Sequence, residues 1–420
     1  MFIPSALVLA PLGGAGSPAT LFGIGLMGWY LMLWLHPASQ LSRGLQPIRS
    51  AAIIFACTIV AAYVSANRQA LPALQLNGAD RGLISLTGWL GVLMLAADGL
   101  DRWDALQTML RRIVNGATVI AAIGVTQFTT GLNIAQYVAI PGFVTKVAFT
   151  DLTVRDGLNR PSVTAAQPLE LAAVLALCLP LALHQARFAA AGSRVRCWLK
   201  VALIAGVMPM TVSRSGMLGL AAVVLAVVPT WRKRERRVAY LAMLGAVGLF
   251  WVLVPRMVTI FYQLFSQIGA ESSSESRISA YTSAATFIAQ HPWLGRGFQT
   301  FFPQTYFFTD NQYLASLIET GVVGLLALVA LFATGWCAAR SARRGVIDPK
   351  TRDLLQCLAG SVAAAAVAFS TFDALSFSIE TGLTVLVLGC VGAAWRLVRA
   401  QQSVCGLSAR AAAGGLENRQ

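Results

Sequence analysis

The chain has 420 residues, of which 56% are hydrophobic and 12% are charged. Soluble domains carry about 25% charged residues, so this composition, with a mean hydropathy of +0.66, excludes an ordinary soluble protein. The 32 Lys and Arg residues outnumber the 17 Asp and Glu residues, which gives a net charge of +15. These basic residues occur in short runs between apolar stretches. That pattern is typical of a polytopic membrane protein, and we expect no nucleic-acid partner.

Metal and cofactor chemistry has little support in the sequence. The seven cysteines form no Cys-x-x-Cys pair, and there are only three histidines. We therefore expect neither a disulfide framework nor a thiolate or histidine metal site. The outward loops contain no Gly-x-x-x-x-Gly-Lys-[Ser/Thr] phosphate cradle and no Asp-x-Asp pair. The sequence thus predicts no nucleotide, metal or other cofactor.

Because unpaired backbone groups cannot face lipid, so apolar a chain must cross the membrane as helices of about 20 residues. We predict one all-α integral membrane domain over residues 1–400 with eleven spans, or twelve if the short apolar segment 2–14 also crosses. That segment is alternatively interfacial, and a secretory signal is disfavoured because no Lys or Arg precedes it. The eleven spans are expected near residues 17–37, 47–68, 80–100, 113–130, 168–188, 197–212, 213–231, 236–256, 313–338, 354–373 and 377–398.

Alternate connections between these spans carry most of the basic residues and mark the cytoplasmic side. Of the outward connections, residues 131–167 and 257–312 are long, and loops beyond about 12 to 15 residues are usually functional or disordered. The aromatic stretch 298–308 predicts that the second loop is a folded, partly helical cap between two late spans. Residues 401–420 are expected to be a disordered cytoplasmic tail.

Six basic residues lie on the outward side against this bias: Lys146, Arg155, Arg160, Arg214, Arg277 and Arg296. Arg214 is the most anomalous, because its turn joins two apolar runs with no room for a loop. A charge there normally has a partner or a purpose. It either snorkels to lipid phosphates, pairs with an acid such as Glu170, or binds a substrate. Guanidinium groups match phosphate oxygens bidentately, so several at one depth indicate a site for a lipid-borne diphosphate such as a polyprenyl diphosphate-linked sugar.

Three segments carry a resemblance to the bacterial O-antigen ligase and polysaccharide polymerase superfamily. His291-Pro-Trp-Leu-Gly-Arg-Gly-Phe298, followed by Asp310-Asn-Gln-Tyr-Leu-Ala-Ser-Leu-Ile-Glu-Thr-Gly321, resembles the family's PxxGxG stretch and its [HD]NxYLxxLxExG motif. Thr211-Val-Ser-Arg-Ser-Gly216 is similar to its T-x-S-R-[SG] segment, and Arg160-Pro-Ser-Val-Thr164 with Pro168 is similar to a looser motif. The resemblance covers about residues 155–325.

The resemblance implies a multi-span transferase in the bacterial inner membrane, with its active site facing the periplasm and without metal or nucleotide. Such an enzyme moves a glycan, with inversion, from undecaprenyl diphosphate to a lipid or glycan acceptor. Carried over by position, Arg214 and Arg277 hold the diphosphate and Arg160 is a third contact. Asp310 stands where the ligases usually have histidine, and we expect it to act as the general base. Further substrate contacts are expected at His291, Arg296, Asn311, Tyr313 and Glu319.

Several of these residues have a structural alternative. Thr309-Asp-Asn-Gln312 resembles a capping box, which would place Asp310 in the first helical turn, where the helix dipole weakens its basicity. Glu319 is alternatively the partner of an intramembrane arginine, and His291 a loop contact. Asp373 and Glu380, which flank the last outward turn, read as ordinary interface charges.

Two functional classes remain open. The first is a glycosyltransferase, for which the Asp-Asn-x-Tyr-Leu form favours a surface polysaccharide polymerase, with an O-antigen ligase that acts on lipid A-core as the alternative. The second is a transporter or flippase of lipid-linked glycan, which is disfavoured because we find no pair of matching repeats with interrupted helices. Membrane lipids and other polysaccharide-assembly proteins are the expected partners.

Overall fold

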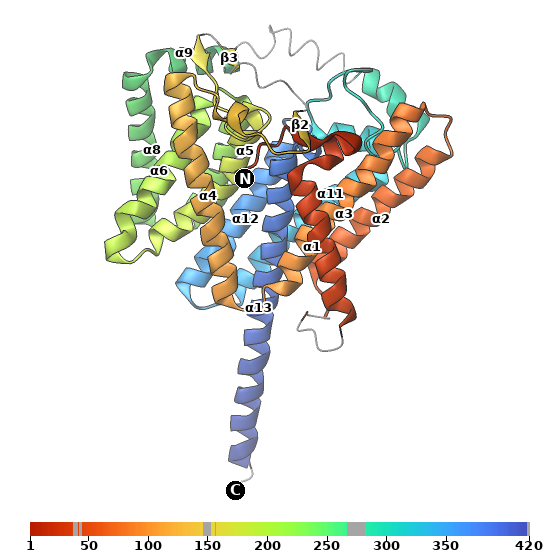
Figure 1. The fold of residues 1–420 in the computed structure, drawn as a ribbon. Helices are drawn as coiled ribbons and strands as arrows, with labels where there is room; N and C mark the ends of the chain where they lie inside the picture. The colour runs from red at the N-terminus through yellow and green to blue at the C-terminus, as the bar shows by residue number, and fades with distance from the viewer. Residues whose placement is uncertain (37–40, 42–43, 146–152, 156, 267–281, 418–420) are drawn as a thin grey trace.

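The computed structural model describes residues 1–36, 41, 44–145, 153–155, 157–266 and 282–417, and the described part is a helical bundle (Figure 1). Its long helices are α1 (Pro18–Leu35), α2 (Pro47–Asn67), α3 (Ala73–Gly99), α4 (Trp103–Thr130), α5 (Pro168–Arg187), α6 (Arg194–Met210), α7 (Arg214–Val227), α8 (Lys233–Leu253), α11 (Gln312–Arg344), α12 (Pro349–Phe369) and α13 (Ser378–Glu417). Shorter elements are α9 (Pro255–Ser266), the helical residues 282–290, and two small antiparallel sheets that pair β1 (Leu7–Leu9) with β2 (Phe143–Thr145) and β3 (Val154–Arg155) with β4 (Leu158–Asn159).

The predicted all-α membrane fold is confirmed. Each of the eleven expected spans coincides with a helix. Within the described ranges, nine helices are long and apolar enough to cross a membrane, and α6 and α7 are shorter. The predicted starts at 80 and 113 are too late, because α3 and α4 begin at Ala73 and Trp103. The added segments mix polar and charged residues with apolar ones, so they lengthen each helix beyond the stretch that hydropathy detects.

At both ends of the chain, the structure differs from the sequence-based prediction. Residues 2–14 do not form a twelfth span: β1 pairs with β2 of the first long loop and is followed by a short 3-10 helix, η1 (Ala10–Gly16). The segment therefore belongs to the loops, as the interfacial alternative predicts. At the other end α13 continues to Glu417, where a disordered tail was expected. The tail contains the helix formers Ala and Gln beside its glycines, so its polarity alone does not indicate disorder.

The bundle has two distinct ends. The first residues of α5, α7, α11 and α13 lie at one end, together with the described parts of the two long loops; we name it the long-loop face (Figure 1). The opposite end, from which α13 projects, is the short-loop face. Basic residues such as Arg194, Arg232 and Arg344 lie at this second end, which the positive-inside rule assigns to the cytoplasm.

Helices α5, α12 and α13 form the interior, whereas no residue of α8 is buried. Small residues let some helices approach closely. A Cβ on Gly91 of α3 would lie 2.2 Å from the carbonyl oxygen of Gly23 of α1, and one on Gly23 would lie 2.4 Å from that of Gly88. Such close backbone contact is the usual basis of helix association in membranes, where apolar burial gives no net advantage over lipid.

A buried ion network joins α5, α8 and α12 near the short-loop face. The Asp353 carboxylate accepts from Arg187 and lies 2.8 Å from Nδ1 of His184, and Arg187 also reaches Glu235 at 2.6 Å. His184, Asp353 and Cys357 have ligand atoms within 4.8 Å of one another, as a metal site would need. Because Asp353 is already neutralised by Arg187, we interpret the group as a structural ion network.

Candidate functional site

Helix α11 is broken at Gly321, which has φ 65° and ψ −169°. A break of this kind frees backbone groups on both sides of it, and near a bilayer they must find protein partners. The segment 291–297 of the large loop supplies them. The hydrogen bonds run from Arg296 N–H to the Ile318 carbonyl (3.0 Å), from Gly297 N–H to Glu319 (2.8 Å), from Val322 N–H to Pro292 (2.9 Å) and from Val323 N–H to Trp293 (3.2 Å).

Two glycines make this contact possible. A Cβ on Gly321 would lie 2.3 Å from the carbonyl carbon of Trp293, and a Cβ on Gly295 would lie 2.3 Å from that of Glu319. Both glycines also have positive φ, 65° and 67°, a conformation that costs other residues energy. The two motifs that carry the family resemblance are therefore one structural unit, in which a loop completes a broken helix.

Arg296 has partners within the protein. Its Nη2 donates to Oε1 of Gln75 (2.9 Å) and to the hydroxyl of Tyr306 (2.7 Å). Its guanidinium also lies over the rings of Tyr306 and Phe287, at 4.9 and 5.5 Å from the centroids. These contacts join the large loop to α3. They give Arg296 a structural task, and its expected contact with substrate stays a prediction.

Glu319 is buried beside the break, and among the described residues no arginine pairs with it. Its Oε1 accepts from the backbone N–H of Phe301 (3.3 Å), so the carboxylate helps to hold the large loop. The part of the chain that the structure describes therefore does not contain the intramembrane ion pair considered from the sequence. His291 lies in the same loop and is half-buried, and its backbone carbonyl accepts from Gly295 N–H (3.1 Å).

The start of α11 differs from the predicted capping box. Asn311 is the N-cap, and its side chain accepts from the N–H groups of Tyr313 (3.0 Å) and Leu314 (3.4 Å). Asp310 therefore precedes the helix, half-buried and with a positive φ of 46°. The expected position in the first helical turn was wrong. Tyr313 packs inward, where its hydroxyl donates to the Ala366 carbonyl (2.8 Å).

Asp373, from the turn between α12 and α13, contacts both neighbours of Asp310. Its Oδ1 accepts from the hydroxyl of Thr309 and from the N–H of Asn311 (3.3 Å). Burial raises the pKa of the Asp373 carboxyl above its usual value, and the nearby charge of Asp310 adds to this. The sequence signal for this residue is an acid in the outward turn, which by itself indicates an ordinary interface charge.

Arg160 contacts the turn that precedes Arg214 and α7. Nε of Arg160 donates to the carbonyl of Thr211 (2.8 Å), three residues before Arg214. Arg214 is the first residue of α7 and is half-buried. Burial lowers the pKa of Arg160 below its usual value, and repulsion from Arg155 adds to this, so a further cationic group lies close.

Arg256 is a basic residue of this region that the sequence analysis missed. A Cβ on Gly157, between Arg155 and Arg160, would lie 3.5 Å from Nη1 of Arg256. The residue is the second of α9, whose Met257 and Ile260 pack against Val212 in the turn before Arg214. Arg256 lies at the outward end of the predicted span 236–256. A basic residue on the outward side is unusual there, as it is for Arg155, and this signal could have identified it.

Glu170 does not pair with Arg214. Its fully buried carboxylate accepts from Ser5 Oγ (3.1 Å) and from the N–H groups of Ala166 (2.7 Å), Ile379 (3.1 Å) and Glu380 (3.4 Å). Arg277 and Lys146 lie outside the described residues. The remaining predicted site residues all lie on the long-loop face, in three groups: Arg160 with Arg214; Asp310, Asn311 and Tyr313; and His291, Arg296 and Glu319.

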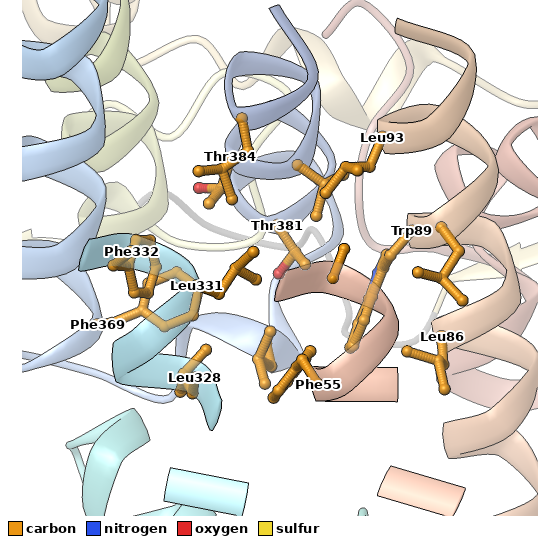
Figure 2. A pocket seen from close by; sticks show the side chains of 15 residues that line it. Phe55, Leu86, Trp89, Leu93, Leu328, Leu331, Phe332, Phe369, Thr381 and Thr384 are labelled. Atoms are coloured by element: carbon orange, nitrogen blue, oxygen red, sulfur yellow. The ribbon is translucent and has the colours of Figure 1, made fainter. Parts of the chain in front are cut away.

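An interior cavity offers no alternative site. It has a volume of about 30 Å³ and lies between α2, α3, α11, α12 and α13. Figure 2 shows apolar side chains such as Phe55, Trp89 and Phe332 around it, with Thr381 and Thr384 of α13. Space on this scale admits a water molecule at most, and the apolar walls offer few partners even for water.

The comparisons with known proteins fall on the same part of the chain. A family model described as O-antigen ligase matches residues 199–329, which include Arg214, the large loop and the break in α11. An O-antigen ligase of Pseudomonas aeruginosa is 27% identical over 143 residues, and the aligned part is 32% of this chain and 32% of that protein. These matches confirm the resemblance to the O-antigen ligase and polysaccharide polymerase superfamily. The similarity spans about a third of the relative's length.

We predict that Gly321→Ala destabilises the protein and reduces its activity, because a side chain there meets the Trp293 backbone and the backbone conformation, which is essentially restricted to glycine, costs other residues about 1–3 kcal/mol. Thermal unfolding of the purified protein in detergent measures the effect. Gly245→Ala in α8 is the control, since a Cβ at Gly245 meets nothing within 4 Å. Equal unfolding temperatures for the two variants would contradict this account of the broken helix.

Proposed function

We propose that the protein is a glycosyltransferase that moves a glycan from a polyprenyl diphosphate carrier to an acceptor at the periplasmic face of the inner membrane. The observation that carries the proposal is the meeting of Arg160 with the turn of Arg214 on the long-loop face, with Arg256 near the same loop. Fixed guanidinium groups at a membrane boundary suit a diphosphate whose lipid tail stays in the bilayer.

In the proposed reaction the acceptor hydroxyl oxygen attacks the anomeric carbon of the donor sugar. The bond from that carbon to the diphosphate oxygen breaks, and the electron pair leaves with the polyprenyl diphosphate. Arginines stabilise the charge that develops on this leaving group. Asp310 takes the proton of the acceptor hydroxyl as general base. Attack from the side opposite the leaving group inverts the anomeric configuration, and no step needs a metal ion.

The acceptor decides between two forms of this activity. A polymerase transfers the growing glycan to a new lipid-linked repeat unit, whereas a ligase transfers the finished chain to lipid A-core. Asp310 in place of the usual histidine favours the polymerase. The names of the matching family and of the Pseudomonas relative favour the ligase.

Deleting the gene separates the two forms, because each leaves a different substrate unused. Accumulated single lipid-linked repeat units are the expected result for a polymerase, and accumulated long lipid-linked polymer for a ligase. Mass spectrometry of extracted polyprenyl diphosphate glycans makes the measurement. An unchanged pool of intermediates together with normal surface polysaccharide would exclude both forms.

Arg214→Ala should abolish glycan transfer while the protein still inserts at the wild-type level, because the diphosphate loses a bidentate partner. Arg214→Lys should recover only part of the activity, since a lysine keeps the charge without the planar pair of donors. Surface polysaccharide in a complemented deletion strain is the readout. Arg196→Ala, an exposed change on the short-loop face, is the control. Full activity of Arg214→Ala would reject the diphosphate role.

Asp310→Asn should reduce the transfer rate at least about a hundredfold, because general-base catalysis contributes about 10² to 10⁴. Asp310→His should retain activity if the two residues found at this position in the superfamily are interchangeable here. Transfer in membranes that contain each variant at equal abundance is the measurement. A near-normal rate for Asp310→Asn would mean that this aspartate serves only the local structure.

A further inference from the structure

We propose that Asp373 is a positioning residue that holds Asp310 in its reactive orientation. The proposal rests on the proposed function, because it takes Asp310 to be the general base. One atom makes both contacts: Oδ1 of Asp373 accepts from the Thr309 hydroxyl and from the Asn311 N–H (3.3 Å), the residues directly before and after Asp310.

Asp310 needs such support because its backbone has a positive φ of 46°. For an L-residue this left-handed conformation is less stable than the right-handed or extended one, although Asp tolerates it better than most. A strained residue persists only where its surroundings over-determine it. With both neighbours released, rotation of the Asp310 backbone would move the carboxylate away from the acceptor.

The two segments hold each other at further points. The N–H of Leu375, in the short 3-10 helix η5 (Ala374–Ser376), donates to Oε1 of Gln312 (2.9 Å). The hydroxyl of Tyr313 donates to the Ala366 carbonyl of α12 (2.8 Å). These bonds follow Asp310 in the chain and, together with the Thr309 contact before it, they hold the start of α11 against α12 and the turn that follows α12. Positioning of this kind matters for rate, because a misplacement of 1 Å can cost a hundredfold.

The charge of Asp373 is not what the positioning requires. Both donors meet the same oxygen, which an asparagine would retain. Burial and the charge of Asp310 also raise the pKa of the Asp373 carboxyl, so a neutral side chain fits this place. Asp373→Asn therefore separates geometry from charge, and Asp373→Ala removes both.

The test measures kcat and KM of the full-length protein in detergent with a polyprenyl diphosphate-linked glycan as donor. We expect Asp373→Ala and Thr309→Val to lower kcat about ten- to a hundredfold with KM within about threefold, since the donor site is untouched. Asp373→Asn and Thr309→Ser should restore kcat to within about threefold of wild type. Thr371→Val is the matched control, because the Thr371 hydroxyl, in the same turn, donates to the Ala368 carbonyl near the end of α12 (2.8 Å).

Wild-type kcat in both Asp373→Ala and Thr309→Val would overturn the proposal. The proposal would also fail if Asp373→Asn had a kcat as low as that of Asp373→Ala while Thr309→Val kept the wild-type kcat, because Asp373 would then act through its charge. If Asp373→Ala does not fold, Thr309→Val and its serine rescue decide the question. Asp310→Asn, assayed in parallel, separates the general-base role of Asp310 from the positioning role of Asp373. If Asp310→Asn is fully active, the general-base role fails. If Asp310→Asn is slow while the Asp373 and Thr309 variants are fast, only the positioning role fails.

Discussion

The structure of the long-loop face depends on one constraint: backbone groups freed by the break in α11 have to be hydrogen-bonded by protein. The Pro292-to-Gly297 segment meets this requirement, with four hydrogen bonds and two glycines that allow backbone to lie on backbone. Two further contacts of described loop residues lie beside it. The Arg296 guanidinium donates hydrogen bonds to Gln75 and Tyr306, and the Phe301 N–H donates one to the Glu319 carboxylate. Residues 291–301 of the large loop are thereby held against the helix that they complete.

Backbone strain gathers on the same face. Among the described residues, four other than glycine have positive φ: Val163, Val212, Gln299 and Asp310. Two are β-branched, for which the conformation is a genuine outlier. Val163 is held by its N–H bond to the Gln127 side chain (2.8 Å), and Val212 directly precedes Ser213 and Arg214. Strain of this kind persists where a surrounding framework imposes it, and such places are often functional. Its position beside Arg214 and at Asp310 agrees with the proposed reaction.

Much of the fold could be predicted from the sequence, because a membrane allows few solutions. Apolar length and basic residues specify spans and sides, and the structure has a helix at every expected span. Helix ends were less accurate, since helices such as α4 extend beyond the apolar stretch that hydropathy detects. Residues 2–14 were ambiguous because β1 forms only by pairing with β2. The first residues of the two strands, Leu7 and Phe143, are 136 positions apart in the sequence.

For the candidate site, the sequence suggests residues but not their contacts. Motif spacing led to Arg160, Arg214 and Asp310, but spacing carries no information on which donor meets which carboxylate. Glu170 and Arg214 lie 44 positions apart and were natural partners by charge, yet Glu170 binds three other segments. Because Asp373 and Asp310 are both acidic, a search for opposite charges in the sequence would not predict that they are neighbours. Their proximity results from hydrogen bonds through Thr309 and Asn311, which only the folded chain reveals.

A fully buried carboxylate connects the two halves of the proposed site. Burying such a group is costly unless donors surround it, and Glu170 obtains them from the first long loop at Ala166 and from the start of α13 at Ile379 and Glu380. Arg160 lies six residues before the first of these contacts, and Asp373 six residues before the second. The hydrogen bonds of Glu170 therefore join the segment of Arg160, the proposed diphosphate contact, to the segment that follows Asp373. Arg160 and Asp310 are thereby kept at one spacing, although both lie in long loops. The proposed reaction between a lipid-held donor and an incoming acceptor requires such a spacing.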